Sequence, residues 1–232
     1  MPSFERQSTR GTDRIAFEPK ALIMAGWTGR DRAAVQQHID ELGALGVPPP
    51  SCTPLFYQMD PALLCTAMTI DVLGESTSGE LETVRVALAD GLWVGLGSDH
   101  TDRAMEAHGV AISKQLCRKP MAPGLWRFDE IAGHWDDLML RAHIVEDGQR
   151  RLYMEAALAT VRPPEDLISG YRTSIGLPAA GELPALTVLF MGALNAIGGI
   201  RPARHFAMVL EDPVLGRELA HAYEARPLAL IA

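Results

Sequence analysis

The Asp90-Gly91 pair is the feature that most restricts how this chain can fold. Apolar and β-branched residues flank the pair on both sides, and this arrangement is the strongest short-range signal for a β-hairpin. If Asp90 and Gly91 are the two loop residues, the register places Glu82 opposite Asp99, with Cβ atoms roughly 4.5–5.5 Å apart. Glu80 shares the face of Glu82, because side chains alternate along a strand. The sequence therefore predicts three carboxylates that converge on one face of the hairpin.

Three neighbouring carboxylates repel one another, and proteins relieve this repulsion by raising a pKa or by holding a cation. A site with only oxygen ligands suits a hard ion such as Mg²⁺, Mn²⁺ or Ca²⁺. We therefore predict a divalent metal site formed by Glu80, Glu82 and Asp99. The alternative is the exposed end of a surface hairpin, where acidic residues are common and bind nothing.

Composition excludes several classes of partner. The 232 residues are 47% hydrophobic, which is ordinary for a chain with a substantial core. Twenty-nine acidic residues against twenty-one basic ones give a net charge of -8 with no basic run, which argues against nucleic acid and anionic membranes and favours a small-molecule ligand. The first apolar run, 21–27, is too short for a membrane span or a signal sequence, so we expect a cytoplasmic protein. The cysteines are odd in number and lack metal-ligand spacing, which predicts reduced, buried thiols at Cys52, Cys65 and Cys117.

Many short strands and a few helices predict a single β-dominated α+β domain over residues 1–232. We expect a polar lead-in at 1–14, and a helix that starts at Asp31 and joins a proline-rich candidate lid within 30–62. Five prolines in 48–61 predict an irregular segment there. Further helices are expected at 104–116 and 163–174. Further strands are expected at 15–27, 67–73, 138–145, 151–160, 187–191, 206–210 and 219–228.

Other side chains offer catalytic chemistry. His38 and Glu41 are three residues apart on the predicted first helix, and a carboxylate beside an imidazole makes a better water-activating base. An ordinary surface contact is the alternative. Arg103 and Lys114 follow Asp99 and are suited to neutralising a carboxylate or an oxyanion, with simple solvation as the alternative. The remaining histidines show no ligand spacing and are interpreted as structural: His100, His108, His134, His143, His205 and His221.

Taken in order, these motifs resemble a remote bacterial branch of the fumarylacetoacetate hydrolase superfamily. Each motif alone is weakly specific, but five of them occur in the order of the family. They are His38-x-x-Glu41 with the prolines of 48–54 and Phe56; Glu80-x-Glu82; Asp99-His100-Thr101-Asp102-Arg103; Lys114 ahead of Pro123-Gly124-Leu125-Trp126; and Gly192-Ala193-Leu194 with Gly198-Gly199.

The resemblance implies a mixed β-roll or sandwich like the C-terminal domain of that family, a homodimer, and Mg²⁺ or Mn²⁺ on Glu80, Glu82 and Asp99, with Ca²⁺ possible in crystals. The implied activity is hydrolysis of a C–C bond in a 1,3-dicarbonyl or acylpyruvate-type 2-keto acid through a metal-stabilised enolate. The implied catalytic residues are His38, Glu41 and Lys114, and the implied substrate contacts are Arg103, Gly192 and Ala193. A decarboxylase, hydratase or tautomerase on the same metal, or a catalytically silent ligand-binding protein, are the alternatives.

Three positions depart from the family pattern. Ala193 replaces a threonine and removes a hydroxyl that would contact a ligand carboxylate. Glu106 stands in place of a glutamine and adds negative charge, and Cys117 stands where an aspartate often follows the lysine. The departures bear on the reaction more than on the metal site.

Overall fold

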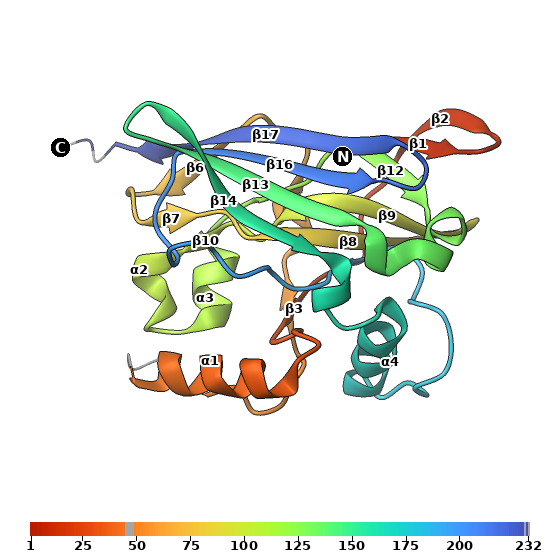
Figure 1. Cartoon of the computed structure of the whole chain (residues 1–232), viewed down its shortest axis with the longest axis horizontal. Coiled ribbons are helices and arrows are strands. Elements are labelled where there is room, and N and C mark those ends of the chain that lie inside the picture. The colour runs from red at the N-terminus through yellow and green to blue at the C-terminus, as the bar shows by residue number, and fades with distance from the viewer. Residues whose placement is uncertain (45–48, 230, 232) are drawn as a thin grey trace.

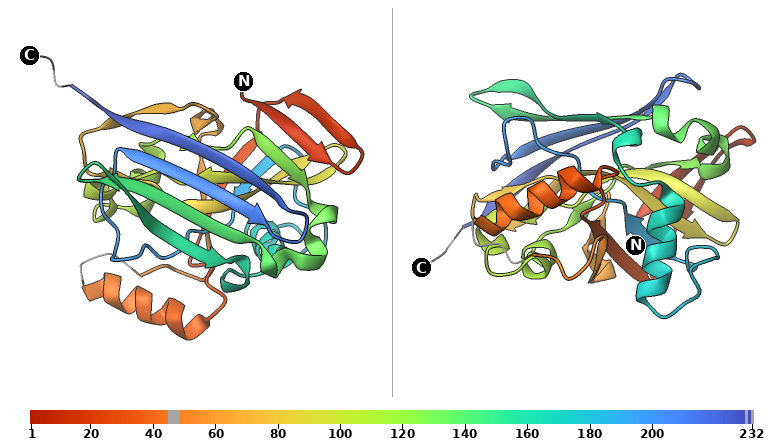
Figure 2. Two further views of the ribbon diagram at one scale, coloured as in Figure 1. Left: turned by 45° about the horizontal axis from the view of Figure 1, so that its top comes forward. Right: turned by 60° about the horizontal axis from the view of Figure 1, so that its bottom comes forward.

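Two twisted sheets stacked on each other form the body of the protein, and the helices lie on the far side of the larger sheet (Figures 1 and 2). The computed structural model describes residues 1–44, 49–229 and 231. Within the first helix, the side chains of His38, Glu41, Leu42 and Ala44 lie outside the described residues. The β-dominated α+β architecture agrees with the fold class predicted from the sequence.

The larger sheet has eight strands and carries the predicted hairpin at its centre. In spatial order the strands are β2 (Gly11–Ala16), β1 (Ser3–Ser8), β12 (Gly124–Arg127), β9 (Gly91–Ser98), β8 (Leu81–Leu88), β15 (Thr187–Phe190), β3 (Ala21–Gly26) and β4 (Leu55–Met59). The β1–β12 and β15–β3 pairs are parallel, and the others are antiparallel.

The smaller sheet has five strands and covers one face of the larger one (Figure 1). Its strands are, in spatial order, β14 (Gln149–Ala157), β13 (Met139–Glu146), β16 (His205–Asp212), β17 (Arg217–Leu228) and β6 (Thr69–Leu73). Two short ladders join β10 (Thr101–Asp102) to β7 (Thr77–Ser78) and β11 (Lys119–Pro120) to β5 (Leu64–Cys65). The largest apolar cluster fills the space between the two sheets.

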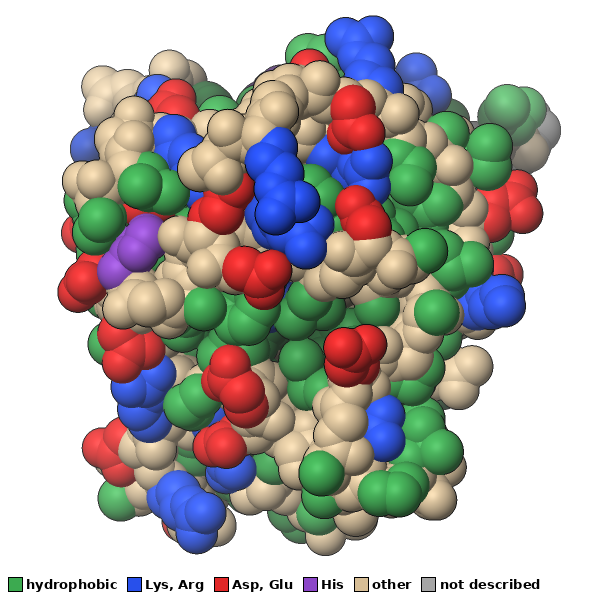
Figure 3. Space-filling model, turned by 90° about the vertical axis from the view of Figure 1, so that its right-hand side faces the viewer, with side chains coloured by type: hydrophobic (Ala, Val, Ile, Leu, Met, Phe, Trp, Pro, Cys, Tyr) green, Lys and Arg blue, Asp and Glu red, His purple; other side chains and the backbone are tan. Residues whose placement is uncertain are grey.

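The α-helices are α1 (Arg32–Ala44), α2 (Arg103–Glu106), α3 (Val110–Gln115) and α4 (Pro164–Ser174), with 3₁₀ turns η1 (Pro61–Leu63), η2 (Phe128–Glu130), η3 (Ala132–Asp137) and η4 (Leu158–Thr160). None of the helices in the described part of the chain has the length and apolar character needed to span a bilayer. Acidic and basic side chains are interspersed on the face shown in Figure 3.

Strand β8 is buried along its whole length, because it lies between β9 and β15 and both of its faces are covered. On one face the Arg85 guanidinium lies 4.0 Å from the ring centroids of both Phe128 and Trp135, and burial lowers the pKa of Arg85 to about 9. On the other face Glu82 precedes Val84 in a second apolar cluster. The Glu82 carboxylate is therefore shielded from water because it lies on a strand that is covered on both faces.

The predicted hairpin is present, but its loop lies one residue earlier than expected. Leu88 pairs with Gly91, so the loop residues are Ala89 and Asp90. The Asp90 carboxylate accepts hydrogen bonds from Trp93 Nε1 at 3.1 Å and from Arg6 at 2.8 Å. The bond from β1 is a tertiary contact that the local dipeptide signal does not report.

The shifted loop changes which residues are opposed but not which face they share. Glu82 faces Gly97 instead of Asp99, and the Asp99 N–H donates to the Glu80 carbonyl at 2.9 Å. The predicted Glu82–Asp99 pairing was therefore wrong. Because the shift displaces the pairing by two positions, and side chains repeat every two residues, all three carboxylates remain on one face.

Three other local predictions were wrong. The polar lead-in 1–14 contains β1 and most of β2, since pairing with β12 and the buried ring of Phe4 anchor this hairpin to the sheet. The proline-rich segment 48–61 contains β4, because its prolines flank five consecutive residues without interrupting them. The helix at 104–116 is divided at Gly109 into α2 and α3.

The remaining helices and most of the remaining strands lie close to their predicted positions. Cys65 and Cys117 are buried as expected, and Cys52 is exposed, contrary to expectation, in the segment before β4.

Gly97 lies opposite Glu82 in the hairpin. Because it has no side chain, the Phe190 ring packs closely against it. A Cβ atom there would lie 2.6 Å from the Phe190 ring and 2.9 Å from Val84 Cγ2. Both neighbours are fully buried and belong to the cluster on the face of the three carboxylates. The packing of the Phe190 ring over β8 and β9 beside the site therefore depends on glycine at position 97.

We expect Gly97→Ala to lower the free energy of unfolding by about 1–3 kcal/mol, because the new methyl group overpacks a closed cluster. Gly133→Ala is the matched control, since a Cβ there meets no atom within 4 Å. Urea unfolding of both variants measures the difference, and equal midpoints for Gly97→Ala and the wild type would contradict this account.

Candidate metal centre

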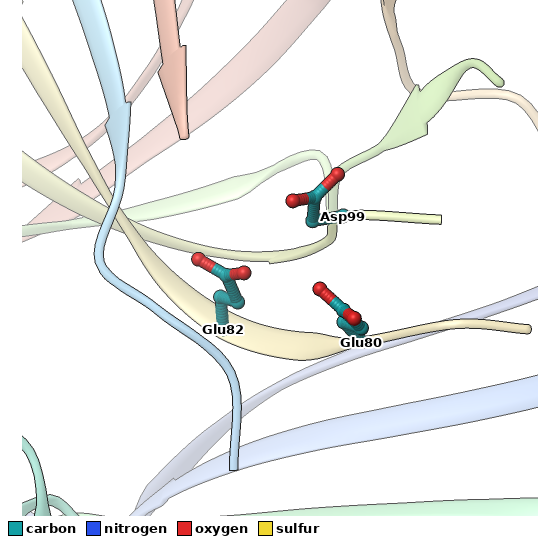
Figure 4. Close-up of side chains that lie close together, drawn as sticks. All are labelled: Glu80, Glu82 and Asp99. Carbon is teal, nitrogen blue, oxygen red and sulfur yellow. The ribbon is translucent and has the colours of Figure 1, made fainter. Parts of the chain in front are cut away.

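The three predicted carboxylates meet at the end of the β8–β9 hairpin (Figure 4). Glu80 and Glu82 rise from one strand and its lead-in, and Asp99 follows the neighbouring strand. One oxygen of each lies within 4.8 Å of the others. Glu80 is 9% exposed and the other two are 1% exposed, which differs from the wet hairpin end considered as the alternative. Among the described residues, this is the one His, Cys, Asp and Glu group with metal-binding spacing.

Three cations surround the carboxylates: the buried Lys114 and Lys119 and the partly buried Arg103. Lys114 Nζ lies 2.9 Å from Glu80 Oε2 and 2.5 Å from Asp99 Oδ2. Arg103 reaches the other oxygen of Glu80 at 2.8 Å, and Lys119 Nζ reaches the other oxygen of Asp99 at 2.6 Å. The simple solvation considered for Arg103 and Lys114 is therefore wrong, because both are engaged inside the protein. Each oxygen of Glu80 and of Asp99 therefore contacts a cation, and Lys114 is shared between the two carboxylates.

The cations determine the ionisation of Glu80. Burial by itself would raise the pKa of its carboxyl, but the charges of Lys114 and Arg103 outweigh burial and lower the pKa to about 2. Because this value lies below that of the unfolded chain, ionised Glu80 stabilises the fold above about pH 4.5, and the contribution is lost as the pH falls toward 2. The same partners act in return on Lys114, whose pKa is raised by Asp99 and Glu80 against the effect of burial.

Glu82 is in the opposite situation. Burial and the nearby charge of Asp99 raise its pKa well above the ordinary value. Its Oε2 accepts a hydrogen bond of 2.6 Å from the Gly192 N–H. Gly192 has φ of +99°, and a Cβ there would lie 1.8 Å from Thr28 Oγ1, so the close approach requires glycine. Glu82 is the member of the site whose negative charge is least compensated.

A hydrogen-bonded chain ties the aspartate segment to the smaller sheet. Tyr223 OH, from β17, lies 2.7 Å from Ser98 Oγ and 2.9 Å from His100 Nδ1, the two residues flanking the aspartate ligand. Ser98 Oγ accepts from the Glu80 N–H at 3.2 Å, and Lys119 Nζ donates to the His100 carbonyl at 2.7 Å. Burial and the charge of Lys119 lower the pKa of His100 to about 3, so this imidazole is neutral at pH 7.

The residues present fit a divalent cation. All three donors are carboxylate oxygens, the set that Mg²⁺ and Mn²⁺ prefer. One oxygen of each carboxylate lies within 4.8 Å of the others, which is close enough for the three side chains to share one ion. Glu82, with its uncompensated charge, gains most from such an ion.

The substrate residues implied by the resemblance are placed at different depths. Arg103 Nε donates to Ser78 Oγ at 2.7 Å, and its terminal nitrogens contact Glu80 and Glu106, the latter at 3.2 Å. Glu106, one of the departures from the family pattern, thus engages the arginine expected to hold a substrate carboxylate. Gly192 contacts Glu82, while Ala193 is exposed.

His38 and Glu41 lie on α1 as predicted, but their side chains lie outside the described residues. Their role as a catalytic pair stays a prediction. Three further residues of the site were missed by sequence reasoning: Lys119, His100 and Tyr223. His100 adjoins Asp99, and Lys119 follows Lys114 by five residues, but neither spacing indicates a shared site. Tyr223 is 123 residues from His100, so no local sequence pattern could place it there.

The architecture belongs to the class of fumarylacetoacetate hydrolase-like folds. A yeast fumarylacetoacetate hydrolase family protein superposes with a TM-score of 0.63 at 13% identity, covering 90% of this chain and 94% of that one. A 2-keto-3-deoxy-D-arabinonate dehydratase complexed with magnesium and 2,5-dioxopentanoate gives 0.60 at 17%, covering 94% and 78%. The 4-oxalocrotonate decarboxylase of Pseudomonas putida G7, complexed with magnesium and adipate, gives 0.55 at 14%, covering 89% and 77%.

By sequence, the chain belongs to the family described as a protein of unknown function (DUF2848), whose model matches residues 25–223. No curated protein shows significant sequence similarity to it. The fold implied by the resemblance is thus confirmed, as a remote relationship.

Two isosteric variants test the charge distribution in the metal-free protein. We expect Glu80→Gln to lose about 3 kcal/mol of stability, because Lys114 and Arg103 lose a buried ionised partner. Glu82→Gln is expected to gain about 1 kcal/mol, because it removes a disfavoured charge and keeps an acceptor for Gly192. Denaturant unfolding in the presence of a chelator measures both; a loss of similar size in both variants would argue against the assignment.

Proposed function

We propose that this protein is a divalent-metal-dependent enzyme that cleaves a C–C bond in a 1,3-dicarbonyl or acylpyruvate-type 2-keto acid by hydrolysis. The observation that carries the proposal is the convergence of Glu80, Glu82 and Asp99 within 4.8 Å in a buried setting. The folds of a dehydratase and a decarboxylase that were solved with magnesium support it by analogy.

Glu80, Glu82 and Asp99 would hold Mg²⁺ or Mn²⁺, which supplies a Lewis acid that polarises a substrate carbonyl. Lys114 bridges Glu80 and Asp99 in the structure and is positively charged there, since the charges of these carboxylates raise its pKa against the effect of burial. Its ammonium is placed to compensate the negative charge that develops on the substrate as the enolate forms. Asp99 is held in place by Lys119, which is itself anchored on the His100 carbonyl.

Hydrolysis also needs a base for water. We assign it to His38, oriented by Glu41, on α1, and we propose that residues 30–62 include a lid over a single catalytic domain, 1–232. The adjoining strand β4 is part of the larger sheet, which would restrict any movement to α1 and the segment that follows it. We also propose a homodimer, as the resemblance implies.

A second candidate keeps the metal and omits attack by water: a decarboxylase, hydratase or tautomerase acting through the same enolate. The described side chains support it by supplying what this chemistry needs, a candidate cation site and neighbouring positive charges. Both similar structures named with magnesium are lyases by name.

A third candidate is a protein that binds a ligand without converting it. Two observations favour it: Glu106 occupies Arg103, which would otherwise anchor a substrate carboxylate, and Ala193 has no hydroxyl to offer. Binding of Mg²⁺ or Mn²⁺ without turnover of any acylpyruvate or oxaloacetate would support this candidate over the other two.

Saturating Mg²⁺ or Mn²⁺ is expected to raise the melting temperature of the chelator-stripped wild type by on the order of 5–10 °C, because an ion bound only by the native state stabilises it. Glu82→Ala is expected to lose this shift. A thermal-shift titration measures both, with Na⁺ at matched ionic strength as the control. A wild type that does not respond to either ion would refute the metal site.

Lys114→Ala is expected to lower turnover of the best substrate by on the order of 10²–10³ while metal binding persists, since an oxyanion-stabilising charge is removed. Lys20→Ala, at an exposed lysine, is the control.

His38→Ala separates the two enzymatic candidates, because hydrolysis of an acylpyruvate should collapse whereas decarboxylation of oxaloacetate should survive. Steady-state kinetics on both substrates measures these effects, and unchanged turnover in Lys114→Ala would exclude that residue.

A further inference from the structure

The ammonium group of Lys114 lies where a metal ion would have to bind. Its Nζ is 2.9 Å from Glu80 Oε2 and 2.5 Å from Asp99 Oδ2, so it bridges two of the three candidate ligands. The side chain is buried, with the whole residue 6% exposed. The protein therefore neutralises part of its own metal site with a cation of its own.

The other two cations do not compete for the same space. Arg103 contacts Oε1 of Glu80, and Lys119 contacts Oδ1 of Asp99. Arg103 and Lys119 thus occupy one oxygen of each carboxylate. The other oxygens, Glu80 Oε2 and Asp99 Oδ2, contact Lys114. A divalent ion needs carboxylate oxygens at about 2.1 Å. It cannot share these two oxygens with an ammonium, because the two positive charges would lie within a few ångströms of each other in a buried site.

Lys114 differs from the other two cations in that its ammonium contacts are with the candidate metal ligands. Lys119 is fully buried, donates to the His100 carbonyl and lies in the β11–β5 ladder. Arg103 is held by Ser78 and Glu106 in addition to Glu80. Lys114 lies on α3, a helix of six residues in which Ser113 is the other buried residue. Within the part of the chain that the structure describes, its ammonium donates to the two carboxylates.

We propose that Lys114 is a built-in occupant of the metal site, which a divalent ion displaces when it binds. Displacement transfers the ammonium from Glu80 and Asp99 to the adjoining space, where it is free to pair with an anionic substrate. The lysine then contributes to the reaction only after the metal has bound, which enforces metal binding before substrate binding. This inference rests on the proposed metal-dependent function.

The chain has three lysines, which makes a labelling experiment direct. Lys20 is exposed and serves as the reactive reference, and Lys119 is fully buried and serves as the protected one. Wild-type protein is treated with acetic anhydride in chelator or in saturating Mg²⁺, and each lysine is quantified by peptide mass spectrometry. We expect Mg²⁺ to raise acetylation of Lys114 at least tenfold while Lys20 and Lys119 remain unchanged.

Isothermal titration calorimetry with Mg²⁺ alone gives an independent measurement. Lys114→Met removes the competing charge and keeps an unbranched side chain, so we expect the Kd for Mg²⁺ to fall at least tenfold. Arg118→Met removes one charge from an exposed side chain nearby in sequence and is expected to change the Kd less than twofold. If Lys114→Met does not fold, the labelling of the wild type still decides the question.

The outcomes separate this inference from the proposed function. If calorimetry shows Mg²⁺ bound to the wild type while Lys114 stays as protected as Lys119, displacement is refuted and the metal site stands. An unchanged Kd in folded Lys114→Met refutes it equally. If the wild type binds no Mg²⁺ at all, the proposed function fails, and displacement fails with it.

Discussion

The pairing of two buried carboxylates, Glu80 and Asp99, with three cations at the end of one hairpin is the constraint on which the site depends. Removing one partner of a buried ion pair costs about 3–5 kcal/mol, and here each oxygen of Glu80 and Asp99 contacts a cation, with Lys114 shared between them. The cations come from separate segments, Arg103 at the start of α2, Lys114 on α3 and Lys119 in β11, so the cluster also joins these segments to the hairpin. The site is thus part of what holds this end of the protein together.

Within this cluster Glu82 is the exception. Its carboxylate is buried beside Asp99 with one backbone N–H as its described donor, and its pKa is raised instead of lowered. A protein selected only for stability would not keep such a group, because a neutral side chain of the same shape would be favoured. An uncompensated carboxylate is, however, what a bound divalent ion uses. The structure therefore combines two carboxylates stabilised by cations with a third, Glu82, whose charge a bound ion would stabilise.

The hairpin shows how sequence patterns succeed and fail at once. The predicted loop was one residue too late, so the predicted pairing of Glu82 with Asp99 was wrong. The three carboxylates nevertheless lie on one face, because strand side chains repeat every two residues. The prolines of 48–61 predicted an irregular segment, but this prediction was wrong. A strand needs only a short proline-free interval, which Leu55–Met59 provides. Arg103 and Lys114 were expected near the site from their place in the chain, whereas Lys119 and Tyr223 were not, because no local spacing brings them there.

By itself the sequence determined the β-rich class, the main hairpins, the face shared by Glu80, Glu82 and Asp99, and the oxygen-only chemistry of that face, because alternation and donor type are local properties. Only the tertiary structure decided that the site is buried, that Glu80 and Glu82 ionise differently, and that Lys114 bridges two of the ligands. Those properties depend on desolvation and on charges from distant segments, and both arise only when the sheets and helices pack together.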